Sequence, residues 1–142
     1  MRYAYPINLT PDEDGRLVVA FPDVRGASTD GADETEAIAN ASDSLTAALT
    51  AHITLGQPIP RPSPARGRPA VALSPLVAAK LALYSTMLEQ KVTSADLAHR
   101  MRRTESEVQR LLDLDHRSDI GQIEVALAEL GKRLEIRVRN AA

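Results

Sequence analysis

The sequence lacks cysteine and tryptophan and has a single phenylalanine among its 142 residues. The missing cysteines exclude disulfides, thiolate metal sites and cysteine nucleophiles. Because aromatic residues make up only 3% of the chain, any core must be built from Leu, Ile, Val and Ala. No apolar run approaches the ~18 residues of a membrane span, and the N-terminus lacks a basic region followed by an apolar run. We therefore expect a soluble, cytoplasmic protein of one domain or two small ones, with no membrane partner.

The net charge of −2 conceals an uneven distribution. Residues 1–57 carry nine acidic groups against three arginines, and residues 58–69 carry three arginines and no acid. Residues 70–142 carry eleven basic against ten acidic groups. An acidic module repels nucleic acid and can attract a basic protein, so the asymmetry indicates two modules with different partners.

The front half shows the pattern of a small β-sheet. Period-two alternation predicts a half-buried strand over residues 3–9, which Pro6 places at an edge or a bulge. The turn-forming run of residues 11–15 then predicts a hairpin with a returning strand over residues 17–21. Residues 26–30 can form a short third strand.

A helix over residues 33–55 follows, opened by a capping pair of Asp33 and Glu36. Its predicted core face comprises Ile38, Ala41, Leu45, Ala48, Leu49 and Ile53. Residues 58–69 hold five of the nine prolines, which indicates a semi-rigid extended linker or, alternatively, a proline-rich recognition motif. Residues 69–73 can be a fourth strand that returns to the first sheet, which would extend the first domain to residue 73.

The back half, residues 74–142, reads as four helices followed by a strand. Ser74-Pro75 is a favoured helix start, and the buried stripe of this first helix is predicted to be Val77, Leu81, Tyr84 and Leu88. The last helix begins at Ser118 or Asp119, with Ile120, Ile123, Leu127 and Leu130 on one face and Gly131 as its C-cap. Residues 134–138 alternate as a strand, whose natural partner is the same strand of a second subunit.

Between these helices, residues 93–112 form two short half-apolar helices joined by a tight turn. Each opens with a capping box, Thr93 with Asp96 and Thr104 with Glu107. The stretch alone fits either a helix-turn-helix or an ordinary pair of helices in a bundle, and the helices around it favour the former. It resembles the phage-repressor type of helix-turn-helix, except that Arg102-Arg103 stands where that family usually has a glycine.

In that motif the start of the second helix faces base edges and flanking groups hold phosphates. Carried onto this sequence, the outward positions are Glu105, Ser106, Gln109 and Arg110, and the phosphate candidates are Arg100, Arg102, Arg103 and Arg117. Gln109 can pair with adenine and Arg110 with guanine. The alternative is a solvated surface on which these arginines pair with Glu105, Glu107, Asp113 and Asp115.

The front half resembles the HicB antitoxin family over nearly all of residues 3–63. The resemblance rests on Tyr5-Pro6, Asp14-Gly15, Val18-Val19, residues 21–24, Gly26, Ser28-Thr29, Gly31, residues 34–37, Asn40-Ala41, Leu45, and the ending over residues 56–63 with Arg61 interposed. It implies a partial ribonuclease-H-like βββαβ domain, here residues 1–73, joined to a DNA-binding domain, here residues 74–142. It also implies an antitoxin that neutralises HicA, a small basic mRNA ribonuclease, in a complex that represses its own operon.

No enzyme signature accompanies this resemblance. The strands over residues 3–9 and 70–73 lack the carboxylates that a working ribonuclease H needs for two metal ions. His52, His99 and His116 are far apart and in no metal-ligand spacing. We expect a non-enzymatic antitoxin that binds a HicA-type toxin and operator DNA as at least a homodimer, with no catalytic residues, cofactor or metal. The alternative is a stand-alone regulator whose front domain senses a ligand or dimerises.

Overall fold

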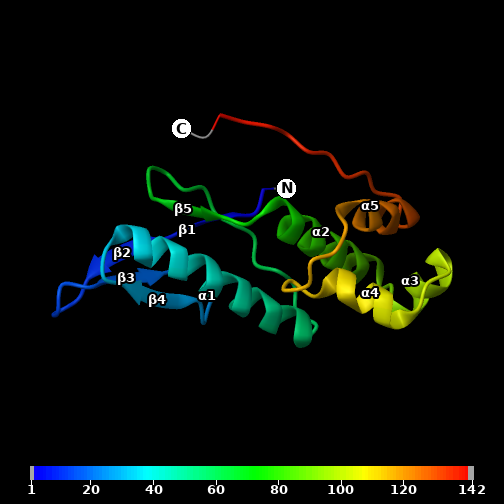
Figure 1. Cartoon of the computed structure of the whole chain (residues 1–142), viewed down its shortest axis with the longest axis horizontal. Coiled ribbons are helices and arrows are strands. Elements are labelled where there is room, and N and C mark those ends of the chain that lie inside the picture. The colour runs from blue at the N-terminus through cyan, green and yellow to red at the C-terminus, as the bar shows by residue number, and fades with distance from the viewer. Residues whose placement is uncertain (1, 141–142) are drawn as a thin grey trace. The chain divides into compact units, whose positions relative to one another are not determined.

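The computed structural model describes residues 2–140, and the chain divides into two compact units, Met1–Ala78 and Ala79–Ala142. Small antiparallel sheets combined with five helices confirm the predicted α+β class (Figure 1). The first unit contains β1 (Ala4–Pro6), β2 (Asn8–Pro11), β3 (Leu17–Ala20), β4 (Ser28–Gly31), α1 (Glu34–Thr54) and β5 (Ala70–Ala72). The second contains most of α2 (Pro75–Gln90), α3 (Ser94–Met101), α4 (Glu105–Leu112) and α5 (Ile120–Glu129).

β2, β3 and β4 form an antiparallel three-stranded sheet in sequence order. Leu9 lies opposite Val19 in the β2–β3 register. Asp12 closes the turn between these strands, because its carboxylate accepts hydrogen bonds of 2.9 Å from the backbone N–H groups of Asp14 and Arg16. The predicted hairpin and the third strand are therefore confirmed.

The single strand predicted over residues 3–9 is wrong, because the chain forms two strands that part at Ile7. β1 pairs antiparallel with β5, and β2 pairs with β3. Pro6 has no N–H to extend a ladder, whereas the N–H of Ile7 donates to the carbonyl of Pro69 at 2.9 Å. The predicted return of residues 69–73 to the first strand is confirmed by the pairing of Tyr5 with Val71.

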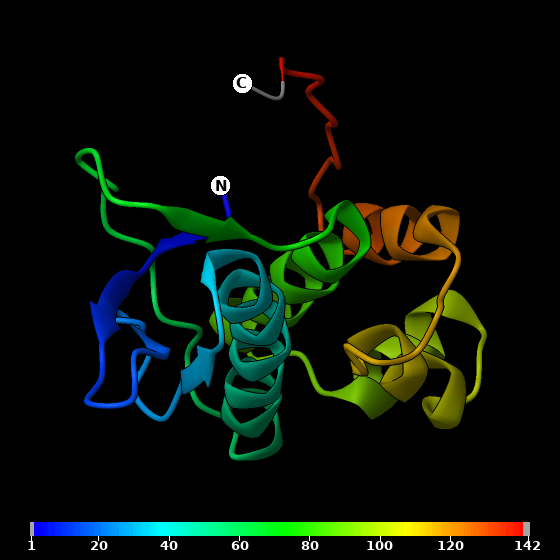
Figure 2. The ribbon, with the colours of Figure 1, turned by 60° about the vertical axis from the view of Figure 1, so that its left-hand side comes forward.

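α1 lies against the β2–β3–β4 sheet (Figure 2). Its buried residues are Ala37, Ala41, Leu45 and Leu49. Ile38 is 36% exposed, so its predicted place on the core face is wrong. A Cβ on Gly31 of β4 would lie 2.6 Å from the Cα of Ala37. The backbones of β4 and α1 therefore approach closely, and this contact turns Ala37, rather than Ile38, toward the sheet.

The proline-rich segment of residues 58–69 contains no helix or strand and is part of the first unit. The buried hydroxyl of Tyr5 donates to the carbonyl of Pro60 at 2.7 Å. The carboxylate of Asp23 accepts hydrogen bonds from the backbone N–H of Ser63 at 2.8 Å and from its hydroxyl at 2.9 Å. These contacts fix the extended segment against the unit, and burial raises the pKa of Tyr5.

α2 begins where the sequence predicted, with the Ser74 hydroxyl accepting from the N–H of Val77 at 3.2 Å. Of the four residues predicted to form the buried stripe of α2, two are buried. Leu81 and Tyr84 are buried, whereas Val77 is half-buried and Leu88 is 38% exposed. The buried positions instead include a polar residue, Lys80, together with Ala79, Leu83, Thr86 and Met87. The core-facing stripe therefore contains a lysine.

α5 is capped by Asp119 and ends as predicted, with Gly131 in a left-handed conformation just after the C-cap at Leu130. Ile123, Leu127 and Leu130 are buried, and Ile120 is half-buried. The strand predicted over residues 134–138 is absent, because residues 132–140 extend without any strand partner among the described residues. Ile136 and Val138 are 68% and 93% exposed.

Candidate nucleic-acid interface

The sequence of α3 and α4 fixes the start of each helix through a complete capping box. The hydroxyl of Thr93 accepts from the N–H of Asp96, and the Asp96 carboxylate accepts from the N–H of Thr93, both at 3.1 Å. Thr104 and Glu107 repeat this exchange at 3.1 Å in α4. The helix pair predicted from sequence is therefore present, with both capping boxes.

Two of the carboxylates on these helices are engaged in the capping boxes. Hydrogen bonds from Thr93 lower the pKa of Asp96, so this carboxyl stays ionised at the positive end of α3. The carboxylate of Glu107 is bound to the backbone of Thr104. Glu107 therefore serves the end of α4, and Glu105 is the acid that remains free in its first turn.

The turn between α3 and α4 uses an arginine where a glycine would be expected. Arg102 has φ 56° and ψ 45°, the left-handed conformation. Its N–H donates to His99 at 3.2 Å, and that of Arg103 donates to Ala98 at 2.9 Å. This pair of hydrogen bonds is a Schellman motif, which commonly has glycine at the left-handed position. The turn therefore keeps this geometry although arginine stands where glycine is usual.

We expect Arg102→Gly to stabilise the second unit by about 0.5–1 kcal/mol. A left-handed conformation costs an L-residue about 1–2 kcal/mol. Glycine removes this strain, but part of the gain is lost because glycine gives the unfolded chain more conformational entropy. Thermal unfolding followed by helix content measures the change. The matched control is Arg103→Gly, since Arg103 does not have a positive φ; it should destabilise. A loss of stability in Arg102→Gly would contradict the assignment of strain to this residue.

All seven predicted DNA-binding residues lie on the surface of the second unit. Arg102 and Arg103 occupy the turn, four lie on α4, and one follows it in the loop to α5. The residues on the opposite side of the helix pair, Leu97, Ala98, Val108 and Leu111, are buried. Glu105, Ser106, Gln109 and Arg110 of α4 and Arg117 of the following loop are exposed, and so are Asp113, Asp115 and His116 of that loop.

Among residues 2–140, no arginine of this surface forms an ion pair with an acidic neighbour. Within residues 2–140, the ion pairs are those of Arg16 with Asp30 and Glu36, both in the first unit. The structure therefore does not support the alternative in which the arginines pair with the acids of α4 and the following loop. The guanidinium groups of the turn, of α4 and of the loop face solvent.

The end of α4 is held by a buried ammonium group that the sequence analysis missed. Lys80 is fully buried, and its Nζ donates to the carbonyls of Arg110 and Asp113 at 2.8 Å and to the hydroxyl of Ser118 at 2.7 Å. Burial lowers the pKa of Lys80, and the charge of Asp113 opposes this shift. The sequence did contain one indication of this buried group, a lysine within the apolar stripe of α2, three residues after Val77.

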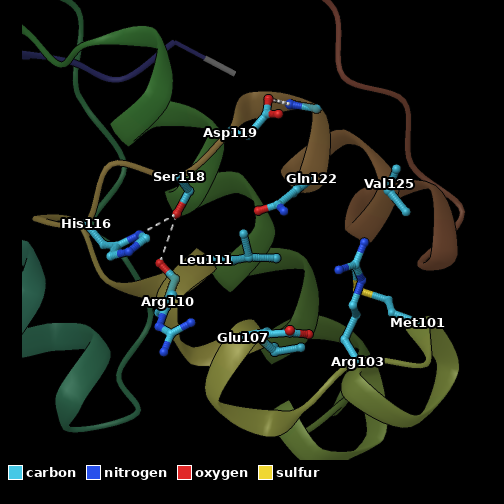
Figure 3. A pocket seen from close by; sticks show the side chains of 12 residues that line it. Met101, Arg103, Glu107, Arg110, Leu111, His116, Ser118, Asp119, Gln122 and Val125 are labelled. Carbon is cyan, nitrogen blue, oxygen red and sulfur yellow. Dashed lines mark hydrogen bonds between the residues drawn. The ribbon is translucent and has the colours of Figure 1, made fainter.

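A cavity of about 360 Å³ lies between α4 and α5 (Figure 3). Met101, Leu111 and Val125 supply apolar lining, while Arg103 and Gln122 supply polar groups. The cavity thus borders two of the predicted DNA-binding arginines. Its full lining is Met101, Arg103, Glu107, Val108, Arg110, Leu111, His116, Ser118, Asp119, Gly121, Gln122 and Val125.

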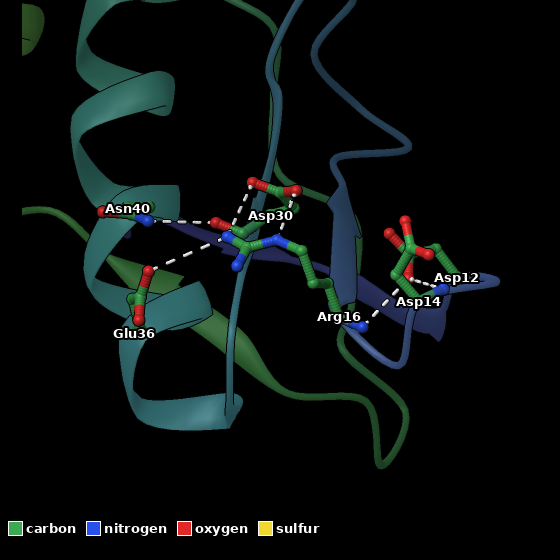
Figure 4. A network of polar contacts seen from close by, with 6 residues as sticks. All are labelled: Asp12, Asp14, Arg16, Asp30, Glu36 and Asn40. Carbon is green, nitrogen blue, oxygen red and sulfur yellow. Dashed lines mark hydrogen bonds and ion pairs between the residues drawn. The ribbon is translucent and has the colours of Figure 1, made fainter.

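The first unit presents the opposite charge. Arg16 binds Asp30 through Nε at 3.0 Å and lies 3.8 Å from Glu36 (Figure 4). These contacts lower the pKa of Asp30 and raise the pKa of Arg16. Arg16 pairs with two of the nine acids of residues 1–57, and the other seven still outnumber the two remaining arginines, so the first unit keeps an acidic excess in this segment. Its exposed acids are Glu13, Asp14, Asp33, Glu34, Glu36 and Asp43.

Within residues 2–140, no group of three or more His, Asp or Glu side chains is placed to hold a metal ion. The helices in that part of the chain are too short or too polar to cross a membrane.

Comparison with known proteins connects both units to one family. A family model described as "HicB_like antitoxin of bacterial toxin-antitoxin system" matches residues 4–82. Antitoxin HicB of Escherichia coli K12 is 34% identical over 133 residues, which cover 93% of this chain and 96% of the relative. The chain belongs to the HicB-like antitoxin family. The resemblance seen in the sequence of the front half is thereby confirmed.

Two further HicB relatives come from Photorhabdus laumondii. Antitoxin HicB 2 is 37% identical over 132 residues, covering 93% of this chain and 94% of the relative. Antitoxin HicB 1 is 33% identical over 134 residues, covering 94% of this chain and 86% of the relative. Since these alignments reach far beyond residue 82, the similarity to HicB antitoxins includes the helices of the second unit.

Proposed function

We propose that this HicB-like antitoxin binds and neutralises a HicA-type toxin, a small basic mRNA ribonuclease, in the cytoplasm. The observation that carries the proposal is the match to HicB antitoxins over 93% of the chain. That match favours an antitoxin over a stand-alone regulator. The surface acids of residues 1–57 support an occlusion mechanism, in which the first unit covers the basic face with which the toxin binds RNA. In this role the chain inhibits the ribonuclease and catalyses no reaction itself.

The second part of the proposal is that the complex represses its own operon. The domain of residues 74–142 would dimerise and bind operator DNA as a helix-turn-helix, and residues 1–73 would bind the toxin. α4 is the candidate recognition helix, because its apolar side is buried and its polar side is exposed. The unpaired arginines around it can contact phosphates. A homodimer or higher homo-oligomer would place two copies of α4 on two half-sites.

Rescue of growth tests toxin neutralisation. The chain is co-expressed with a HicA-type toxin encoded beside it, either as wild type or with Glu13, Asp14 and Asp43 changed to lysine. We expect wild type to restore growth and the triple variant to fail, because its charge reversal repels a basic partner.

The matched control changes three exposed acids of the second unit, Asp115, Glu124 and Glu129, to lysine. It alters the net charge equally and should still rescue. Failure of wild type to rescue would sink neutralisation itself. Rescue by both triple variants would show that the toxin contacts another surface.

A further inference from the structure

Glu105 is an unpaired acid at the start of the candidate recognition helix. It is the first residue of α4 and is exposed. Its carboxylate has no hydrogen-bond or ion-pair partner in the described part of the chain. The other acid of this turn differs, because the carboxylate of Glu107 accepts a hydrogen bond of 3.1 Å from the backbone N–H of Thr104. The fold therefore engages Glu107 and leaves the charge of Glu105 free for a partner.

The start of α4 does not depend on the carboxylate of Glu105. The helix already begins with a complete capping box between Thr104 and Glu107. A further exposed acid in the first turn gains only a small interaction with the helix dipole. On a surface that contacts DNA the same charge is unfavourable, since the phosphates repel it. Only a specific contact with the DNA can offset that repulsion.

The neighbour of Glu105 along the exposed side of α4 is Gln109. The two residues lie one helical turn apart and both are exposed. At this spacing Cβ atoms are about 5–6 Å apart, and the base pairs of DNA are stacked about 3.4 Å apart. A helix that presents Gln109 to one base edge in the major groove therefore presents Glu105 to a base about one or two pairs away.

The chemistry of a carboxylate restricts which base Glu105 can contact. A carboxylate only accepts hydrogen bonds. In the major groove guanine presents two acceptors and thymine presents one, whereas adenine presents an amino group beside an acceptor. Cytosine alone presents an amino group without an acceptor on its own edge. We propose that Glu105 is a specificity-determining residue, which accepts a hydrogen bond from the N4 amino group of a cytosine in the operator.

Glu105 then selects mainly by acting against other DNA. Where no cytosine amino group is within reach, its carboxylate meets base oxygens and phosphates without a donor, and such an unpaired charge weakens binding. The arginines around α4 can contact the phosphates of any sequence. Glu105 therefore lowers affinity for unrelated DNA and raises the ratio of operator affinity to unrelated affinity, which governs selection among the competing sites of a genome.

This inference rests on the proposed operator binding by α4 and names one base that the helix recognises. It also separates Glu105 from a purely attractive contact. Loss of an attractive base contact weakens binding to the operator and leaves unrelated DNA unaffected. Loss of a repulsive charge strengthens binding to unrelated DNA.

The full-length variant Glu105→Gln tests this role, because glutamine keeps the shape of the side chain and removes its charge. Fluorescence anisotropy measures the binding of wild type and variant to DNA from upstream of the gene and to an unrelated duplex of equal length. We expect the variant to bind the unrelated duplex about threefold to tenfold more tightly, and the ratio of the two affinities to fall by at least about tenfold. An unchanged ratio would overturn the assignment of Glu105.

A scan of single base-pair substitutions in the operator identifies the base. Replacing one particular C·G pair by T·A exchanges the amino donor for an oxygen acceptor. Wild type should lose at least about tenfold in affinity at that pair, and Glu105→Gln less than about threefold. The pair should lie about one or two positions from the A·T pair recognised by Gln109. If the position that depends on Glu105 were not a C·G pair, or if no position depended on it, the assignment would be wrong.

Asp115→Asn is the matched control, because Asp115 is exposed in the loop after α4. It removes the same charge and should leave every base-pair preference unchanged. Thermal unfolding of both variants tests a merely structural role, which would lower the stability of Glu105→Gln without moving any base preference. Absence of sequence-specific binding by wild type would overturn the operator proposal together with this one. Specific binding by wild type with the same base preferences in Glu105→Gln would overturn the role of Glu105 alone.

Discussion

Lys80→Met is expected to destabilise the second unit by about 2–4 kcal/mol, since each buried acceptor left without a donor costs about 1–3 kcal/mol. Methionine retains the apolar stem of the lysine and removes only the ammonium group. The carbonyls of Arg110 and Asp113 then lose their shared donor, while the Ser118 hydroxyl can still donate to Arg110 at 3.2 Å. This remaining hydrogen bond is the reason that the expected loss is not larger.

The arrangement explains why a lysine is tolerated in the core of a small helical unit. An ammonium group has three donors and no acceptor, and Nζ of Lys80 has three acceptors within 2.8 Å. Two of them are carbonyls at the C-terminal end of α4, which carries partial negative charge. Lys80 therefore joins α2 to the end of α4 and to the loop that carries Arg117.

Hydrogen exchange locates the effect of Lys80→Met. Amides of α4 and α5 should lose protection, while those of α1 in the first unit serve as an internal reference. The control variant is Lys132→Met, which removes an exposed ammonium and should change stability by less than about 0.5 kcal/mol. If Lys80→Met retained wild-type protection in α4, its ammonium group would not be the anchor of that helix.

The helices could be predicted because their signals are local. A hydroxyl and a carboxyl three residues apart determine where α3 and α4 begin, whatever surrounds them. The predicted turn at Arg102 was also present, since the Schellman hydrogen bonds form with arginine at the left-handed position. Family resemblance in the front half then supplied the functional class, which helix patterns alone could not.

The features that the sequence did not predict depend on distant partners. The hydrogen-bond acceptors of Lys80 lie 30 to 38 residues further along the chain, so the pattern of α2 showed only an apolar stripe. The rotation of α1 that exposes Ile38 depends on Gly31, which belongs to a strand. Residues 134–138 have a strand pattern, but a strand forms only beside a partner, and the described part of this chain contains none.

Replacing the four candidate phosphate-contacting arginines of the second unit should nearly abolish operator binding. In a variant with Arg100, Arg102, Arg103 and Arg117 changed to glutamine, we expect affinity to fall by about 10²–10³-fold at moderate salt. Four fewer released counterions should reduce the slope of log affinity against log salt by about 3 to 4. Fluorescence anisotropy with DNA from upstream of the gene, at several salt concentrations, measures both quantities.

The matched control removes four exposed arginines of the first unit, Arg2, Arg25, Arg61 and Arg66, in the same way. It changes the net charge equally, so a general charge effect would lower the slope in both variants. We expect the control to keep nearly the wild-type slope, because an acidic module contributes little to phosphate binding. Both quadruple variants should still rescue growth if DNA and toxin bind to different units.

The variant Gln109→Ala distinguishes base recognition from binding to the phosphate backbone of the DNA. Gln109 is exposed on α4 and carries the amide that can pair with adenine. Removing this amide should weaken operator binding by about 1–3 kcal/mol, through the one base pair that it recognises. Affinity for unrelated DNA and the salt slope should stay unchanged. Equal weakening on operator and unrelated DNA would mean that Gln109 does not read a base. No operator-specific binding by wild type at any salt would instead remove the DNA-binding role of α4 altogether.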